Sequence, residues 1–108
     1  MIYELRVYSC LPGKLKDLMA RFENVTLPLW AKHGIQSVGF WTTVIGPTNN
    51  DLTYMIVWES LADREVKWSA FTSDPEWIAA AKESEKNGPL LANIASSLLK
   101  PTSFSHLK

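Results

Sequence analysis

The stretch from Gln36 to Glu59 constrains the fold of this chain more than any other. Its two arms are rich in valine, isoleucine, threonine and aromatic residues, which favour strands, and the segment Gly46–Asp51 between them holds turn residues that a helix rejects. The pattern predicts a β-hairpin. Four large aromatic residues lie on the arms: Phe40, Trp41, Tyr54 and Trp58. We therefore expect the hairpin to form the middle of a sheet and to line any cavity.

The segment before the hairpin predicts a strand and a long helix. Apolar and polar side chains alternate from Ile2 to Cys10, which is the period of a strand with two unlike faces. After a break at residues 11–13, apolar residues recur at helical spacing up to His33-Gly34, where glycine is a common helix end. Pro28 lacks the N–H that its helical turn needs, so we expect a kink around Asn24–Leu27.

The segment after the hairpin predicts a second helix in two pieces and a last strand. Ser60-Leu61-Ala62-Asp63 matches a capping box, which starts a helix at Leu61. Pro75 restarts the helix in a first-turn position, and Asn87-Gly88-Pro89 should end it. Pro101 forbids further regular structure, so we assign the last strand to Ile94–Lys100.

The predicted order of elements is β-α-β-β-α-β, the ferredoxin-like pattern of the α+β class. That topology gives a four-stranded antiparallel sheet in the order 4-1-3-2, with the helices on one face. The other face is left bare, and an exposed apolar sheet face is best covered by a second subunit. We therefore predict a homodimer.

Length and composition narrow the class of protein. The 108 residues predict one domain, residues 1–108, and the 11 basic residues balance the 11 acidic ones, which argues against nucleic acid and anionic membranes as partners. No apolar run approaches the roughly 20 residues of a membrane span, and no signal peptide is visible at residues 1–10. The single cysteine, Cys10, fits a reducing compartment, so we expect a cytoplasmic protein.

Short motifs spread over nearly the whole chain resemble those of the NIPSNAP proteins, within the dimeric α/β-barrel superfamily. They are Tyr3-Glu4-Leu5-Arg6, Leu11-Pro12-Gly13-Lys14, Leu27-Pro28-Leu29, Lys32-His33-Gly34, Val38-Gly39-Phe40-Trp41-Thr42-Thr43, Ile45-Gly46-Pro47, Trp58-Glu59-Ser60-Leu61 and Asp74-Pro75-Glu76-Trp77. The chain departs from the family pattern at residues 53–56, which include Tyr54, and its ending at residues 98–101 matches only loosely. The resemblance implies a dimeric α/β barrel and says less about chemistry.

Similar barrels in that superfamily include cofactor-free monooxygenases that act on quinol-like aromatics, and some haem enzymes. Eukaryotic NIPSNAP proteins are linked to mitochondria and to vesicle-related protein interactions, whereas this chain looks like a bacterial stand-alone domain. Fold analogy by itself is a weak guide to function.

The residues give no indication of a metal or an organic cofactor. The two histidines, His33 and His106, do not form a ligand-spaced pair, and we interpret His33 as a residue placed to favour the end of its helix. The glycines are scattered, so no phosphate-binding loop can be assembled. Cys10 has no basic neighbours in sequence and is interpreted as a small buried residue.

Glu4, Arg6 and Tyr8 are the main candidates for a site, because alternation places all three on one face of a strand that the topology makes central. They form either an internal ion pair with hydrogen bonds or a set that orients a ligand. Including the aromatic residues of the hairpin arms and the helix-end histidine, the candidate ligand-binding residues are Glu4, Arg6, Tyr8, His33, Trp41, Tyr54 and Trp58. The register that decides which faces coincide does not follow from the sequence.

Three functions are compatible with these residues. The leading hypothesis is a dimeric barrel that binds an apolar or aromatic small molecule, with Arg6 as the main fixed positive charge of the site. The first alternative is a cofactor-free monooxygenase in which Arg6, Tyr8 and His33 orient an aromatic substrate and move a proton. The second alternative is a protein-interaction module.

Overall fold

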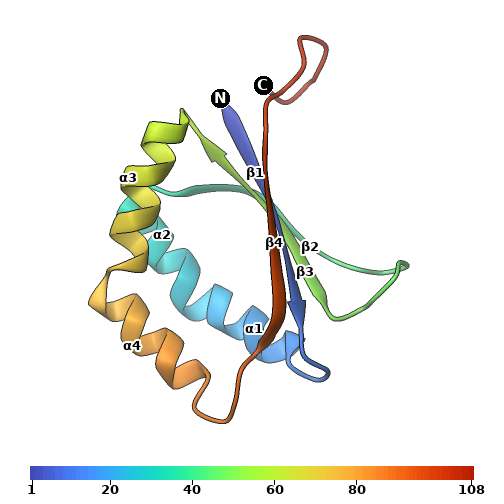
Figure 1. Cartoon of the computed structure of the whole chain (residues 1–108), viewed down its shortest axis with the longest axis vertical. Coiled ribbons are helices and arrows are strands. Elements are labelled where there is room, and N and C mark those ends of the chain that lie inside the picture. The colour runs from blue at the N-terminus through green and yellow to red at the C-terminus, as the bar shows by residue number, and fades with distance from the viewer.

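The computed structural model describes residues 1–108 and has one four-stranded sheet with every helix on the same side (Figure 1). The elements are β1 (Ile2–Cys10), α1 (Leu15–Arg21), η1 (Phe22–Thr26), α2 (Leu27–His33), β2 (Gln36–Thr42), β3 (Asp51–Trp58), α3 (Leu61–Thr72), α4 (Pro75–Ser84) and β4 (Leu91–Leu99). The predicted ferredoxin-like α+β fold is confirmed.

The sheet runs β2-β3-β1-β4 with every neighbouring pair antiparallel, which is the predicted strand order read from the other edge. Arg6 of β1 lies opposite Tyr54 of β3 and opposite Ser96 of β4. Residues directly opposite in an antiparallel pair point to the same face. This register therefore collects three polar side chains from three strands on the side that the helices cover.

The predicted hairpin is present as β2 and β3, joined by the loop of residues 43–50. Trp41 points to the helix-free face of the sheet, and its ring lies against the backbone of Gly39, where an added Cβ would be 2.8 Å from the ring. Only glycine leaves room for the ring in this position. Trp41 is thus held flat on the open face, with 51% of its surface exposed.

The first helix is interrupted where the proline predicted an interruption. Between α1 and α2 the chain widens into the π-helical turn η1, in which the backbone N–H of Leu27 donates to the carbonyl of Phe22. Pro28 follows in the first turn of α2, where its missing N–H and its ring disfavour a regular α-helical turn. Gly34, with φ of 72°, ends α2 in the left-handed conformation, as expected.

The start of α3 confirms the predicted capping box. The backbone N–H of Asp63 donates to Ser60 Oγ at 3.0 Å, and the N–H of Glu59 donates to Asp63 Oδ2 at 3.1 Å. Two otherwise free donors are therefore satisfied at this helix end.

Two boundaries near the C-terminus differ from the prediction. Helix α4 ends at Ser84 rather than near Asn87, because the chain then tightens into turns in which the N–H groups of Glu85, Lys86 and Gly88 each donate to the carbonyl three residues earlier. Strand β4 begins at Leu91 rather than Ile94, because pairing with β1 already starts there.

The space between the sheet and the helices holds an aromatic core. Phe22, Trp30, Tyr54, Trp58 and Phe71 are buried there, and edge-to-face pairs such as Phe22 of η1 with Tyr54 of β3 hold the two layers together. Beyond Leu91, edge strand β4 is exposed along its whole length. None of the helices is both long and apolar enough to cross a membrane.

Candidate functional site

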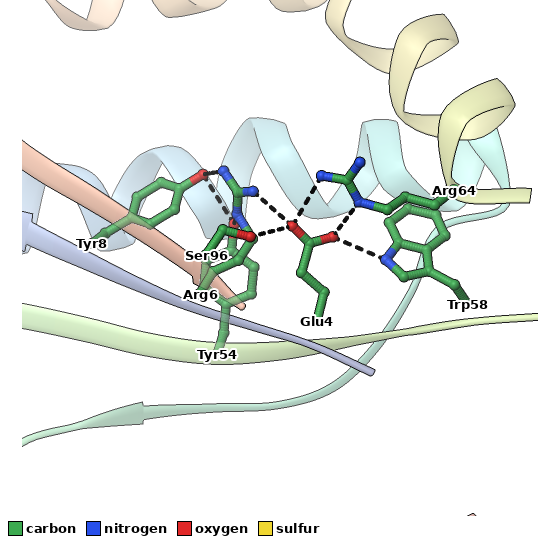
Figure 2. Close-up of polar contacts among 7 residues, drawn as sticks. All are labelled: Glu4, Arg6, Tyr8, Tyr54, Trp58, Arg64 and Ser96. Atoms are coloured by element: carbon green, nitrogen blue, oxygen red, sulfur yellow. Dashed lines mark hydrogen bonds and ion pairs between the residues drawn. The ribbon is translucent and has the colours of Figure 1, made fainter. Parts of the chain in front are cut away.

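A buried polar network lies at the centre of the helix-covered face (Figure 2). Its organising residue is Glu4, whose surface is fully buried. The alternation of β1 directs Glu4, Arg6 and Tyr8 toward the helices, while Leu5 and Val7 point to the open face. The strand therefore turns its polar residues inward and its apolar residues outward, the reverse of an ordinary two-layer sheet.

The carboxylate of Glu4 accepts five hydrogen bonds. Arg64 donates from Nε at 2.8 Å and from Nη2 at 3.2 Å, and Arg6 donates from Nη1 at 2.9 Å. Trp58 Nε1 donates at 3.0 Å and Ser96 Oγ at 2.6 Å. A carboxylate offers about four lone-pair sites, so this one has no free acceptor capacity.

Arg6 connects the carboxylate to two tyrosines. Its Nε donates to the hydroxyl of Tyr54 at 2.8 Å, its Nη2 donates to the hydroxyl of Tyr8 at 3.0 Å, and the two hydroxyls lie 2.9 Å apart. The guanidinium also lies 4.8 Å from the ring centre of Trp68, a cation–π distance. The sequence left open whether Arg6 pairs with Glu4 or with a ligand, and in this structure it pairs with Glu4.

The network fixes the protonation state of Glu4. Burial raises the pKa of this carboxyl, but hydrogen bonds from Arg64, Ser96, Arg6 and Trp58 outweigh burial and lower the pKa to about 2. Glu4 is therefore ionised at neutral pH. With the guanidinium groups of Arg6 and Arg64 beside it, the cluster carries one negative and two positive charges.

Arg6 and Tyr54 also keep one protonation state. Burial lowers the pKa of Arg6, but the neighbouring Tyr54 and Tyr8 and the bonds to Tyr8 and Glu4 raise it above its ordinary value. Burial, together with Tyr8, raises the pKa of Tyr54 well above its usual range. The guanidinium is thus a permanent cation and the phenol a permanent hydrogen-bond donor.

The network reaches the surface at Arg64 and Ser96. The side chain of Arg64 is 28% exposed, and Ser96 lies on exposed strand β4 with Ile94 and Leu98 on either side of it on the same face. An apolar cavity of about 450 Å³ adjoins this edge, lined by Met1, Ile2, Leu61, Leu98, Leu99 and Lys100. Leu98 lies opposite Glu4 in the sheet, and Leu61 precedes Arg64 by one helical turn. Two residues of the cavity wall, Leu98 and Leu61, therefore neighbour Glu4 and Arg64 of the network.

The structure brings together five of the seven residues predicted for the site: Glu4, Arg6, Tyr8, Tyr54 and Trp58. It separates Trp41, which lies on the open face opposite Thr53. It also separates His33, whose Nε2 lies 2.7 Å from Asp74 Oδ2 at the contact between α2 and α4.

Sequence reasoning missed Arg64 and Ser96. A signal for Arg64 was present, because Leu61, Arg64, Trp68 and Phe71 recur at helical spacing and share the face of α3 that meets the sheet. No local signal marks Ser96, whose partner Glu4 is 92 residues away. No three or more His, Cys, Asp or Glu side chains are grouped as metal ligands would be.

A family model described as NIPSNAP matches residues 3–106 of the chain. No curated protein sequence matches this chain.

Solved structures repeat the fold over nearly the whole chain. A NIPSNAP family protein of unknown function from Agrobacterium tumefaciens is 25% identical, with a TM-score of 0.87 over 100% of this chain and 94% of that one. A NIPSNAP-like domain protein from Burkholderia xenovorans is 27% identical, with a TM-score of 0.85 over 96% of this chain and 87% of the other. A putative antibiotic biosynthesis monooxygenase from Nitrosomonas europaea is 6% identical, with a TM-score of 0.64 over 94% and 98% of the two chains, so it shares the fold alone.

Proposed function

This chain belongs to the NIPSNAP family, and from that premise we propose that it is a dimeric α/β barrel that binds a small apolar or aromatic compound. Residues 1–108 act as one domain in this proposal. The free and buried thiol of Cys10 suits the reducing cytoplasm, where we place the protein.

The observation that carries the ligand proposal is the position of an apolar cavity beside a buried charged network, through Leu98 and Leu61. Binding sites for small molecules are mostly apolar and contain a few convergent polar groups that fix orientation. The cavity at Leu61 and Leu98 supplies the apolar walls, and Arg64, which follows Leu61 by one turn of α3, adds a partly exposed guanidinium close to that wall. Its volume of about 450 Å³ falls within the usual range for such sites.

The network supports binding better than proton transfer. A general acid or base works best when its pKa lies near the working pH. Glu4 stays ionised and Tyr54 stays protonated at neutral pH, while His33 lies in a separate contact with Asp74. In the monooxygenase alternative, the group that transfers a proton would therefore be a residue other than Glu4, Tyr54 and His33.

The dimer proposal rests on the helix-free face of the sheet. Leu5, Val7, Met55, Trp41 and Leu99 lie on it, and no helix of the chain covers them. A face of this kind is stable when it packs on the same face of a second copy, which produces a self-complementary interface.

A protein-interaction module remains the second candidate because of the hairpin tip. Val44 and Ile45 are 94% and 95% exposed in the loop between β2 and β3, and in Figure 1 this loop projects on the side away from the helices. An apolar pair held this far from the core is available to a partner protein.

Isothermal titration calorimetry with aromatic compounds tests the ligand proposal. We expect saturable binding, at one site per chain, of at least one member of a panel that includes 1-naphthoate and 1-naphthalenemethanol. Leu98→Asp places a charge in the cavity wall and should abolish this binding, whereas Ile78→Asp, an exposed position on α4, should not. If no compound binds saturably, or both variants bind like the natural protein, the ligand proposal is wrong.

A further inference from the structure

We infer that the site selects an anion, namely a monocarboxylate with an apolar body, and that Arg64 is the residue that recognises the carboxylate. The inference deepens the proposed function and rests on it, since it states the chemistry of the ligand that the cavity takes. It goes beyond the sequence-based expectation, in which Arg6 was the main cation of the site.

The unused hydrogen-bonding capacity of the network consists of donors. The five bonds of Glu4 occupy the only carboxylate in the cluster. The hydroxyl of Tyr54 donates its proton to the hydroxyl oxygen of Tyr8, and Arg6 donates to both oxygens. The proton of the Tyr8 hydroxyl therefore has no acceptor within this group. A ligand that completes this network has to supply acceptor oxygens.

Arg64 keeps unused donors on the side away from Glu4. Its Nε and Nη2 form a two-point contact with the two oxygens of Glu4, at 2.8 and 3.2 Å. Nη1 has no hydrogen-bond partner in the protein, and Figure 2 shows this terminal nitrogen pointing away from the carboxylate. The edge formed by Nη1 and Nη2 is therefore free for a second carboxylate, the group whose geometry a guanidinium edge matches.

The charge of the region favours a negative charge on the ligand. Glu4, Arg6 and Arg64 together carry an excess of one positive charge, and Lys100 adds another at the cavity. Asp63, the acid that precedes Arg64 on α3, is already paired with Lys67 at 2.9 Å. An anion at Arg64 thus meets cations whose charge is only partly neutralised by the protein.

The walls beside Arg64 require an apolar body on that anion. Five of the six residues that line the cavity are apolar, and the sixth is Lys100. A phosphate monoester or a dicarboxylate would bring two charges against walls whose one charged side chain is Lys100, which makes their removal from water more costly. A monocarboxylate on an aromatic or aliphatic group satisfies both parts of the site.

Two ligands of nearly the same shape test the inference by calorimetry: 1-naphthoate, an anion, and 1-naphthalenemethanol, which is neutral. We expect the natural protein to bind the anion at least about 10-fold more tightly, because a guanidinium–carboxylate pair is the stronger contact. Arg64→Met should remove this preference while affinity for the neutral compound changes by less than about 3-fold. Lys67→Met, a loss of one cation on the same helix outside the network, should keep the preference.

The outcomes separate the two proposals. If neither compound binds the natural protein, the proposed function fails and the inference fails with it. If both bind equally, or Arg64→Met keeps the preference for 1-naphthoate, the cavity binds ligands but Arg64 does not recognise an anion. Should Arg64→Met prove unfolded by circular dichroism, Arg64→Gln, which retains an amide donor near Glu4, takes its place, and retention of the preference by that variant again overturns the inference.

Discussion

At the level of single residues, Glu4 is tolerated in the interior because its donors come from four elements: β1, β3, α3 and β4. An unpaired carboxylate in this position would be prohibitively costly. Each of these elements is therefore tied to the same charged group, and the network couples the packing of α3 to the sheet.

Removing that charge should destabilise the protein strongly. Glu4→Gln leaves two guanidinium groups facing each other, and breaking a buried pair in this way typically costs about 3–5 kcal/mol of unfolding free energy. Urea denaturation followed by far-UV circular dichroism measures the loss. Ser96→Ala is the matched control, because it removes one of the five bonds and leaves the charges balanced, so its loss should be clearly smaller. Equal stability of Glu4→Gln and the natural protein would show that the network does not stabilise the fold.

Glu4 also predicts how stability changes in acid. Its pKa in the folded protein, about 2, lies below its ordinary value of 4.5, so the unfolded chain binds the proton more readily. The contribution of Glu4 is present in full above pH 4.5 and falls as the pH drops from 4.5 toward 2. Urea midpoints of the natural protein should decrease over this window, and those of Glu4→Gln should decrease less. Parallel curves for the two proteins would contradict the assignment.

Only part of this site could be predicted from the sequence. The contacts of Arg6 show the physical reason why the rest could not. Alternation along one strand is a local property, so the shared face of Glu4, Arg6 and Tyr8 could be predicted. The pairing of Arg6 with Tyr54 depends on strand register across 48 residues, and the contact of Arg64 with Glu4 spans 60. These contacts depend on tertiary packing, which local pattern does not encode.

At the level of elements, Asp74 joins the start of α4 to the end of α2. Its carboxylate caps α4 by accepting the N–H of Glu76 at 2.9 Å, and it accepts from Lys32 at 2.9 Å and contacts His33 at 2.7 Å on α2. The hydrogen bond with His33, then those from Lys32 and Glu76, hold the pKa of Asp74 well below its usual range.

Substitution of Asp74 should therefore separate its two roles. Asn is as good a helix cap as Asp but carries no charge, so Asp74→Asn should lower the melting temperature less than Asp74→Ala, which loses the cap as well. Because the folded pKa is depressed, the ionic part is present in full above the ordinary value of 3.8 and falls progressively as the pH drops below 3.8 toward the folded pKa. Differential scanning calorimetry at pH 7 and pH 3 should show Asp74→Asn approaching the natural protein at the lower pH. A constant difference between the two would mean that charge plays no part in the contact.

Local signals also explain which boundaries the sequence predicted. The capping box at Ser60 and the proline effect at Pro28 act within one helical turn, and both appear where expected. The start of β4 depends instead on its pairing with β1, far away in sequence, so the prediction placed it three residues late.

At the level of the whole molecule, the open sheet face predicts how the chain assembles. Val7→Arg puts a charge at the centre of that face, between Thr53 and Ala95, and should convert the proposed dimer to a monomer. Multi-angle light scattering at micromolar concentration measures this. Val66→Arg makes the same change at an exposed position of α3 and should leave the dimer intact. A folded, monomeric natural protein would contradict the dimeric barrel.

The central claim is that the ligand binds on the helix-covered side of the sheet, next to the network. A nuclear magnetic resonance titration with 1-naphthoate tests this claim through the indole N–H signals of the five tryptophans. The indole of Trp58 donates to Glu4 inside the network, whereas Trp41 lies on the opposite face of the sheet. We predict that the Trp58 signal shifts in a saturable way and that the Trp41 signal stays in place. A shift of Trp41 with Trp58 unchanged would place the ligand on the open face and contradict the account.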